Sequence, residues 1–248
     1  MPAVPASSGP NPAAAKTPAR QAGVPRRGTA EPGGPKAPRL PSFAAGAPGR
    51  AGDLAAPEAD GRSEGLQFEG DDADGLDLED AVFTDCGFHR VALSGARLTR
   101  ASFGDCEFVD LVAPALEAPD SAWWNTRLER PRIGSAELYG ADLRAVLFDG
   151  GKLGYVNLRQ ATLRDVVFRG AIIEELDLGG ATLERVAFED CRIDALLLNG
   201  ARLVDVDLRG ARLKSITGLS GLRGATVDAL QLQDLAPLLA AEAGLRVR

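Results

Sequence analysis

The chain has 248 residues, with 35 acidic and 28 basic side chains, and its formal net charge is −7. A negatively charged chain repels the phosphates of nucleic acid, so direct DNA or RNA binding by its folded part is not expected. No run of 18 or more apolar residues occurs, so the sequence predicts no membrane-spanning helix.

Residues 1–65 contain 12 of the 16 prolines, together with 10 glycines and 16 alanines. A segment of this composition buries too little apolar surface to offset its chain entropy, so it is predicted to be a disordered tail. The tail carries eight basic against five acidic residues, which suits a solvated tail, a nucleic acid contact or a targeting peptide; the solvated tail is favoured. No apolar stretch follows the N-terminus, so no secretory signal peptide is expected.

Residues 66–217 repeat with a period of five. Stepping by five from Phe68 to Gly218 gives 31 central positions, and 26 of them are Leu, Phe or Ile. The residue two before each centre is mostly small or aliphatic, and the other three are largely polar or glycine. A helix repeats near 3.6 residues and a strand near 2, so neither stays in phase with this pattern over about 150 residues.

A five-residue unit that points its first and third side chains inward must turn a corner with the others, and four such units close one square coil. Preferences specific to one side of the coil should then recur at every fourth unit, and they do. The central positions from 68 to 208, taken every 20 residues, are all Phe or Leu. The inward positions from 81 to 201, taken every 20 residues, are all Ala or Ser. Thirty units predict 7.5 coils, and at the ~4.8 Å spacing of paired strands the rod is about 36 Å long. The predicted structural core includes Phe68, Phe88, Phe108, Phe148, Phe168 and Phe188.

Residues 109–135 interrupt the motif with three prolines, which cannot donate to a β-ladder. The columns of equivalent residues continue on both sides of the interruption. A distorted coil keeps this register, whereas an extruded loop would have to remove a whole coil, so the distorted coil is favoured. Trp123 occupies a central position and is expected to fill the interior. Trp124 points outward, either as a contact residue or packed against local backbone, and the packing is favoured.

Residues 218–248 leave the repeat at Gly218 and are predicted to form a helical cap over the last coil. Thr226 is expected to cap a first short helix. Pro237 is expected to begin a second one that ends near Gly244. The cap is expected to be a lid on the last coil.

The sequence offers no catalytic constellation. Cys86, Cys106 and Cys191 all occupy the small inward position, where they act as apolar filler, so neither a metal site nor a catalytic thiol is expected. Cys86 and Cys106 are separated by four units, hence lie on adjacent coils, and reduced thiols are favoured over a disulfide between them. The only histidine, His89, follows a central residue and should be exposed. Paired acids lie at outward or corner positions of a convex rod that has no cleft to shift their pKa. The chain is therefore not expected to be an enzyme or to need a cofactor.

The run ADLRA–VLFDG–GKLGY–VNLRQ–ATLRD–VVFRG, residues 141–170, resembles the pentapeptide repeat family, whose motif is A(D/N)LXX. The resemblance covers about 150 residues. It implies an all-β fold, a right-handed quadrilateral parallel β-helix with four pentapeptides per coil. The expected domains are a disordered tail at 1–65, the β-helix at 66–217 and a short helical cap at 218–248.

Two functions are considered. The first is a non-enzymatic, cytoplasmic interaction or scaffold protein whose protein partner is unknown. The alternative follows from the resemblance to Qnr-type and mycobacterial quinolone-resistance proteins, which implies an acidic DNA mimic that binds DNA gyrase. The resemblance also implies that the cap is a dimer element, a role it can combine with that of a lid. The candidate dimer contacts are Leu235, Leu238 and Leu239. The charge layout departs from such a mimic. Residues 66–120 hold 13 acids against three bases, but residues 121–217 hold 14 of each. One later side also carries a basic column of Arg132, Lys152, Arg192 and Arg212.

Several apolar residues are predicted to point outward, just before or just after a centre. Leu147 and Val167 fall in one column, while other members lie on neighbouring sides. Single exposed aliphatic residues are common, but together they suit a strip on which a partner docks. The candidate partner contacts are Trp124, Leu147, Val167, Ile172 and Leu197.

Overall fold

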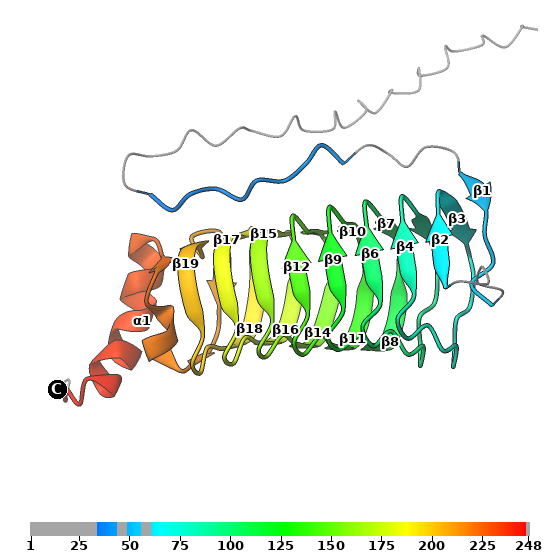
Figure 1. The fold of residues 1–248 in the computed structure, drawn as a ribbon. Helices are drawn as coiled ribbons and strands as arrows, with labels where there is room; N and C mark the ends of the chain where they lie inside the picture. The colour runs from blue at the N-terminus through cyan, green and yellow to red at the C-terminus, as the bar shows by residue number, and fades with distance from the viewer. Residues whose placement is uncertain (1–33, 44–48, 56–60, 247–248) are drawn as a thin grey trace, which may run out of the picture.

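The computed structural model describes residues 34–43, 49–55 and 61–246. These residues form a parallel β-solenoid of about nine turns that ends in one α-helix (Figure 1). The predicted β-helix is therefore confirmed. Strand partners are separated by four pentapeptides of sequence, as in the pairing of Phe68 with Phe88 and of Phe148 with Phe168.

Each turn has four sides, which we name by their central residues. The first side runs from Phe68 to Leu208, the second from Ala73 to Leu213, the third from Leu78 to Leu198 and the fourth from Ser63 to Leu203. The central residues and those two before them form one continuous apolar core. Six phenylalanines of the first side are buried as predicted.

A 15-stranded sheet covers the first and fourth sides. On the first side lie β1 (Arg50–Ala51), β3 (Leu66–Glu69), β5 (Gly87–His89), β7 (Glu107–Val109), β10 (Arg127–Glu129), β13 (Leu147–Asp149) and β22 (Ala225–Thr226). On the fourth side lie β2 (Arg62–Glu64), β4 (Val82–Thr84), β6 (Ser102–Gly104), β9 (Ala122–Trp124) and β12 (Asp142–Arg144). Three strands span both sides: β15 (Thr162–Arg169), β17 (Thr182–Glu189) and β19 (Arg202–Asp207).

A seven-stranded sheet covers the second and third sides. Its members are β8 (Val112–Glu117), β11 (Arg132–Glu137), β14 (Lys152–Asn157), β16 (Ile172–Asp177), β18 (Cys191–Leu197), β20 (Ala211–Leu213) and β21 (Ile216–Thr217). In the first two turns isolated bridges such as Asp72 with Ala92 and Asp77 with Arg97 take the place of strands on these sides.

The corners explain why every fifth residue is so often Gly, Asp or Asn. The corner residue has a positive φ, for example 69° at Gly95 and 53° at Asp105. Glycine, aspartate and asparagine enter this left-handed region at low cost. The corner between the second and third sides differs from Ala115 onward, because residues 115, 135, 155, 175 and 195 are not among those with positive φ. There the strands run through the corner, which is why β8, β11, β14 and β16 each have six residues.

Residues 109–135 form regular coils and not an extruded loop. β8 and β11 pair in register, and Trp123 pairs with Phe103 below and Leu143 above. The carbonyls of Pro119 and Pro131 still take part in the ladder, where they accept hydrogen bonds of 3.0 and 2.9 Å from the neighbouring coils. Trp123 is buried as predicted, and its indole N–H donates to Ser121 Oγ at 2.8 Å.

The coil begins earlier than residue 66, the expected boundary. β1 pairs with β3, and Leu54 is buried in the core, so residues 49–55 cover the first turn. Residues 34–43 also pack on the rod. The expectation of a disordered tail at 1–65 is therefore wrong for these parts, because they find apolar partners on the folded coil. Residues 1–33, 44–48 and 56–60 lie outside the described residues.

The C-terminal end has one helix, α1 (Ala229–Glu242), after the 3-10 turn η1 (Leu219–Leu222). The predicted pair of helices is wrong, because Pro237 lies inside α1 instead of starting a second helix. The N-cap is Asp228 and not Thr226. Asp228 forms a capping box with Gln231, whose side chain also donates to the carbonyls of residues 208 and 211 at 2.6 Å. Gln231 therefore ties α1 to the last coil. None of the helices in the described part has the length and apolar character that crossing a bilayer requires.

Candidate interaction surface

The repeat sets which side chains are available for binding. Residues beside each centre face outward, and equivalent residues of successive coils stack in columns. Arg132 pairs with Lys152, and Lys152 pairs with Ile172. A binding site on the side of the rod is therefore built from columns with one residue per turn.

One outward column lies on the second side and combines basic and apolar residues; we call it the second-side column. It comprises Val112, Arg132, Lys152, Ile172, Arg192 and Arg212. This register confirms the predicted stacking of the four basic residues. Val112 and Ile172 are 40% and 44% exposed.

A hollow of about 660 Å³ lies beside the second-side column. Two successive residues of the adjacent column, Gly134 and Gly154, are part of its lining. Val112, Lys152 and Ile172 line it, and Lys152 pairs with Glu174 at 2.7 Å. The second side therefore presents an apolar hollow rimmed by charges.

The five candidate partner contacts lie on four different sides and do not form one strip. Trp124 is half-buried, and its ring occupies the space where a side chain at Gly104 would lie, so packing against backbone is confirmed. Ile172 is exposed on the second side, and Leu197 is half-buried on the third. Leu147 and Val167 share a column on the first side but are only 5% and 3% exposed, because residues 40 and 43 cover them.

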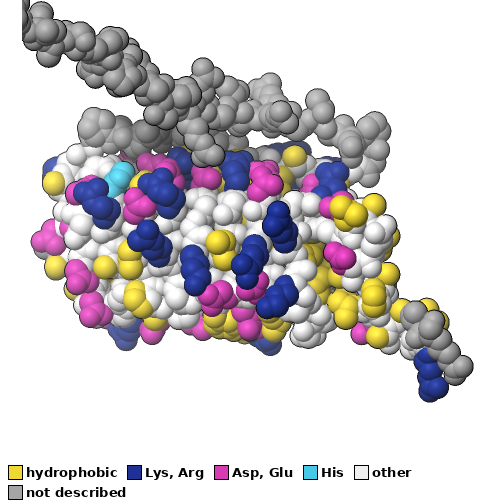
Figure 2. All heavy atoms as spheres, turned by 180° about the vertical axis from the view of Figure 1, so that it is seen from behind, with side chains coloured by type: hydrophobic (Ala, Val, Ile, Leu, Met, Phe, Trp, Pro, Cys, Tyr) yellow, Lys and Arg dark blue, Asp and Glu magenta, His cyan; other side chains and the backbone are white. Residues whose placement is uncertain are grey.

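The candidate dimer contacts on α1 also differ in exposure. Leu235 is buried against the last coil, whereas Leu238 and Leu239 are 44% and 36% exposed. Leu230 and Leu245 are more exposed still. Hydrophobic side chains gather at the end of the rod that carries α1 (Figure 2).

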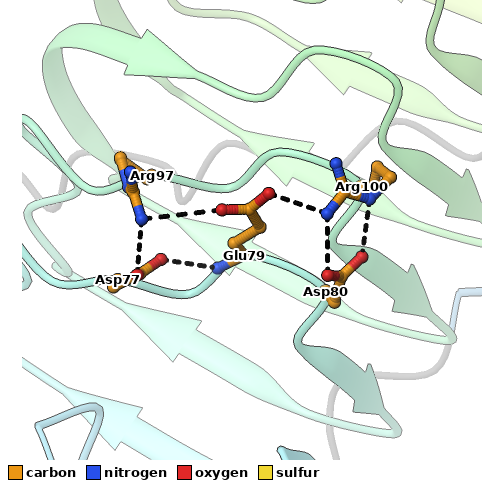
Figure 3. A network of polar contacts seen from close by, with 5 residues as sticks. All are labelled: Asp77, Glu79, Asp80, Arg97 and Arg100. Carbon is orange, nitrogen blue, oxygen red and sulfur yellow. Dashed lines mark hydrogen bonds and ion pairs between the residues drawn. The ribbon is translucent and has the colours of Figure 1, made fainter.

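Charged side chains form inter-coil ion pairs at the corners. Arg97 pairs with Asp77, one turn below it, and lies 3.5 Å from Glu79. Arg100 holds Asp80 with two hydrogen bonds of 2.8 Å and contacts Glu79 at 2.7 Å (Figure 3). Exposed pairs of this kind add little stability. Their effect on the surface is to neutralise arginines at these positions, while other basic side chains gather across the middle of the face in Figure 2.

The described ranges contain no group of three or more His, Cys, Asp or Glu residues that could hold a metal ion. Cys86, Cys106 and Cys191 are buried and free, as predicted. The hydrogen bond to Cys86 and burial raise the pKa of the Cys106 thiol, and burial raises the pKa of Cys191 to about 11. Neither thiol is a nucleophile at neutral pH. His89 is half-buried, although the sequence predicts exposure.

The profile of the pentapeptide repeats matches residues 66–109 and 152–190, in eight copies. The chain belongs to the pentapeptide repeat family. The unmatched stretch between these two ranges contains the three prolines, yet its strands continue the coil without a break. The coil geometry is therefore the same inside and outside the matched ranges.

Two solved structures are similar to this one in fold. A trypsin-treated variant of QnrB1, a plasmid-mediated fluoroquinolone resistance protein, is 20% identical over 75% of this chain and 91% of that chain, with a TM-score of 0.33. HetL, which is involved in heterocyst differentiation regulation in the cyanobacterium Nostoc sp. strain PCC 7120, is 16% identical over 66% of this chain and 90% of that chain, with a TM-score of 0.21. At these identities the likeness concerns the fold alone. No curated protein sequence matches the chain.

The free energy of unfolding of this pentapeptide repeat protein is expected to fall in acid. The hydrogen bond from Arg97 lowers the pKa of Asp77 below its ordinary value of 3.8, and Arg100 does the same for the pKa of Asp80. A carboxyl group with a lowered folded pKa stabilises the fold above the unfolded pKa, and this contribution is lost as the pH falls through the folded pKa. Stability should be level from about pH 8 to 5 and decline below about pH 4. Urea unfolding across this range checks the result, and maximal stability near pH 3 would contradict it.

Proposed function

We propose that this pentapeptide repeat protein is a non-enzymatic interaction or scaffold protein that binds a protein partner through the side of its rod. The observation that carries the proposal is the second-side column with its hollow. Apolar Val112 and Ile172 are exposed there in one column with basic residues, on the outer face of the seven-stranded sheet. An exposed apolar surface rimmed by charges is typical of protein contact sites.

The absence of an enzymatic role is part of the proposal. In the described residues the paired acids, such as Glu174 with Glu175, sit at outward and corner positions along a convex rod. Acid–base catalysis needs such groups in an enclosed site that shifts their pKa. The three buried free thiols are consistent with a reducing, cytoplasmic location.

A charge introduced on the second side tests the proposal. The full chain with Val112→Glu and Ile172→Glu is compared with wild type in quantitative co-purification from the native host. The matched control is Thr162→Glu with Thr182→Glu, which changes two exposed outward residues of the fourth side. We expect the first variant alone to lose its specific partners while its thermal unfolding is unchanged. An identical partner set for all three proteins would remove the second side as the binding surface.

The alternative function is an acidic DNA mimic that binds DNA gyrase and modulates quinolone or gyrase-toxin action. The excess of acids in the first turns supports it, since residues 66–120 hold 13 acids against three bases. The second-side column opposes it, because its basic residues interrupt a uniformly negative surface. A supercoiling assay with purified gyrase, with and without a fluoroquinolone, separates the two functions. If the full chain at micromolar concentrations causes no inhibition and gives no protection, the alternative is excluded.

We also propose that the C-terminal end carries a homodimer contact. Leu238 and Leu239 on α1 leave apolar surface in solvent, and burial of such surface is the main drive for association. Light scattering after gel filtration tests this with the full chain and a Leu238→Glu, Leu239→Glu variant. A monomeric wild type at about 100 µM would contradict the proposal, because protein interfaces of standard size hold at lower concentrations.

A further inference from the structure

Three successive outward residues of the first side are buried although they point away from the core. Leu147 pairs with Val167, and Val167 pairs with Ala187, so the three form one apolar strip across three turns. They are 5%, 3% and 6% exposed. Leu40 and Phe43 pack on them, and the cluster is separate from the main core. We call these three residues the first-side strip.

Polar contacts hold the same segment at the neighbouring corner. The backbone N–H of Arg39 donates to Asp165 Oδ1 at 2.9 Å. Arg185 fixes the same carboxylate with hydrogen bonds of 2.6 and 2.7 Å. Two turns further on, Lys36 lies 3.4 Å from Asp205. Although burial opposes the charged form, the hydrogen bonds from Arg185 and from the Arg39 backbone lower the pKa of Asp165, so it is ionised at neutral pH.

The segment has a period that matches the rod. Residues 35–43 read PKA, PRL, PSF, with a proline at every third position. A proline-rich extended helix has three residues per turn and rises ~3.1 Å per residue, hence about 9.3 Å per turn. Two coils of the solenoid rise about 9.6 Å at ~4.8 Å each. One triplet of the segment therefore advances by two coils.

The contacts follow this two-coil step. Lys36 and Arg39 are three residues apart and bind at corner residues two turns apart, Asp205 and Asp165. Leu40 and Phe43 are also three residues apart. Together they pack on the first-side strip, whose first and last residues are two turns apart. In Figure 1 the segment runs along the rod from the α1 end toward β1. Proline-rich segments are common ligands because their extended form costs little entropy on binding.

We propose that the first-side strip and the Asp165–Asp205 corner form a docking groove for a proline-rich segment with an apolar residue in every third position, and that residues 35–43 of the same chain occupy it. The segment is thus a ligand carried in cis. A partner that uses the first side must displace it, whereas the second-side column stays open. The groove is independent of the function proposed above, which rests on the second side.

Limited trypsin digestion of the full chain tests the occupancy. The bonds after Lys36 and Arg39 are the readout, followed by mass spectrometry. Val167→Glu should accelerate cleavage after Arg39 by at least about 10-fold, because it removes an apolar partner worth about 1.4 kcal/mol or more. The matched control is Ile172→Glu, an equivalent outward position of the second side, which should leave the rate unchanged. A second variant, Leu40→Glu with Phe43→Glu, should accelerate cleavage without altering the rod.

Equal cleavage rates in wild type and the Leu40→Glu, Phe43→Glu variant would overturn the proposal. Light scattering then distinguishes cis from trans occupancy. Protection in a monomer supports it, whereas protection that vanishes when a dimer is diluted would assign the groove to a second copy and overturn the cis assignment.

The vacated groove tests the periodicity directly. A fluorescent peptide of residues 34–43, GPKAPRLPSF, should bind the Leu40→Glu, Phe43→Glu chain and not wild type, whose groove is filled. The control peptide has one glycine inserted between Arg39 and Leu40, which breaks the two-coil register between the polar and apolar contacts. We expect at least about 10-fold weaker binding of the control peptide. Equal affinity of the two peptides, or no binding of either, would contradict the proposed groove.

Discussion

Replacing Phe168 by alanine is expected to lower the free energy of unfolding by about 3–5 kcal/mol. The ring is fully buried and is stacked between two others, with centroid distances of 4.6 Å to Phe148 and 5.0 Å to Phe188. In a solenoid each coil contacts only its neighbours, so the void would weaken the interfaces on both sides of this coil. Urea unfolding followed by circular dichroism measures the loss.

Phe168→Leu is the matched control, and we expect it to cost only about 1 kcal/mol. The first side already contains leucine at two central positions, Leu128 and Leu208. Around Leu128 the core leaves a cavity of only about 10 Å³, at the lower limit of what one water molecule needs. Equal losses for the alanine and leucine variants would contradict the idea that filled volume, and not ring stacking, sets the stability of this column.

This column shows what could be predicted from the sequence. A narrow interior repeats its cross-section every turn, so the same volume is required at positions four units apart. Large residues therefore recur at the centres of the first side, and small residues recur two positions before the centres of the fourth side. The parallel solenoid, the inward cysteines and the stacking of the second-side basic residues all follow from the same period.

The prolines and alanines at 109–135 predict a distorted coil, whereas the structure has a regular coil in which nearby residues fill the lost volume. The turn that holds Ala113 and Ala118 at two centres has Leu111 and Leu116 at the inward positions two residues before them, where the turn below has only Val91 and Ala96. The next turn has Leu128 in the phenylalanine column and the larger Trp123 beside it, 4.2 Å from the ring of Phe103. Volume is conserved per turn and not per position, so a comparison of single columns misses it.

The docked segment could not be predicted from its composition. Leu40 and Phe43 stand in a proline- and alanine-rich stretch, and their burial depends on residues more than 100 positions away. The outward column of Leu147 and Val167 is visible in the sequence and predicts a contact with an external partner. Apolar outward residues identify a covered surface, but they do not say whether the cover comes from another molecule or from the same chain.

Gly154→Ala is expected to destabilise the protein by about 3 kcal/mol or more, although the change adds only one methyl group. The residue lies in β14, and a Cβ atom there would lie 2.1 Å from the carbonyl oxygen of Gly134. That oxygen belongs to the backbone of the adjacent coil and cannot move without breaking the ladder. Gly134 is itself close to the turn below, because a Cβ atom on Gly134 would lie 2.5 Å from the carbonyl oxygen of Pro114.

The control is Gly170→Ala. A glycine with a positive φ is usually the one that tolerates alanine least, but here we expect it to tolerate alanine better than Gly154. Gly170 has a φ of 60°, which alanine enters only at a cost of about 1–2 kcal/mol. Its Cβ position is nevertheless open, with the nearest atom at 4.0 Å, and the chain already holds alanine at the equivalent corner conformation of Ala145, whose φ is 55°. Glycine is therefore required more strictly at Gly154, where coils approach each other, than at a left-handed corner. Urea unfolding of the two variants decides the point: a larger loss for Gly170→Ala would show that corner geometry, and not inter-coil contact, fixes the glycines of the second-side hollow.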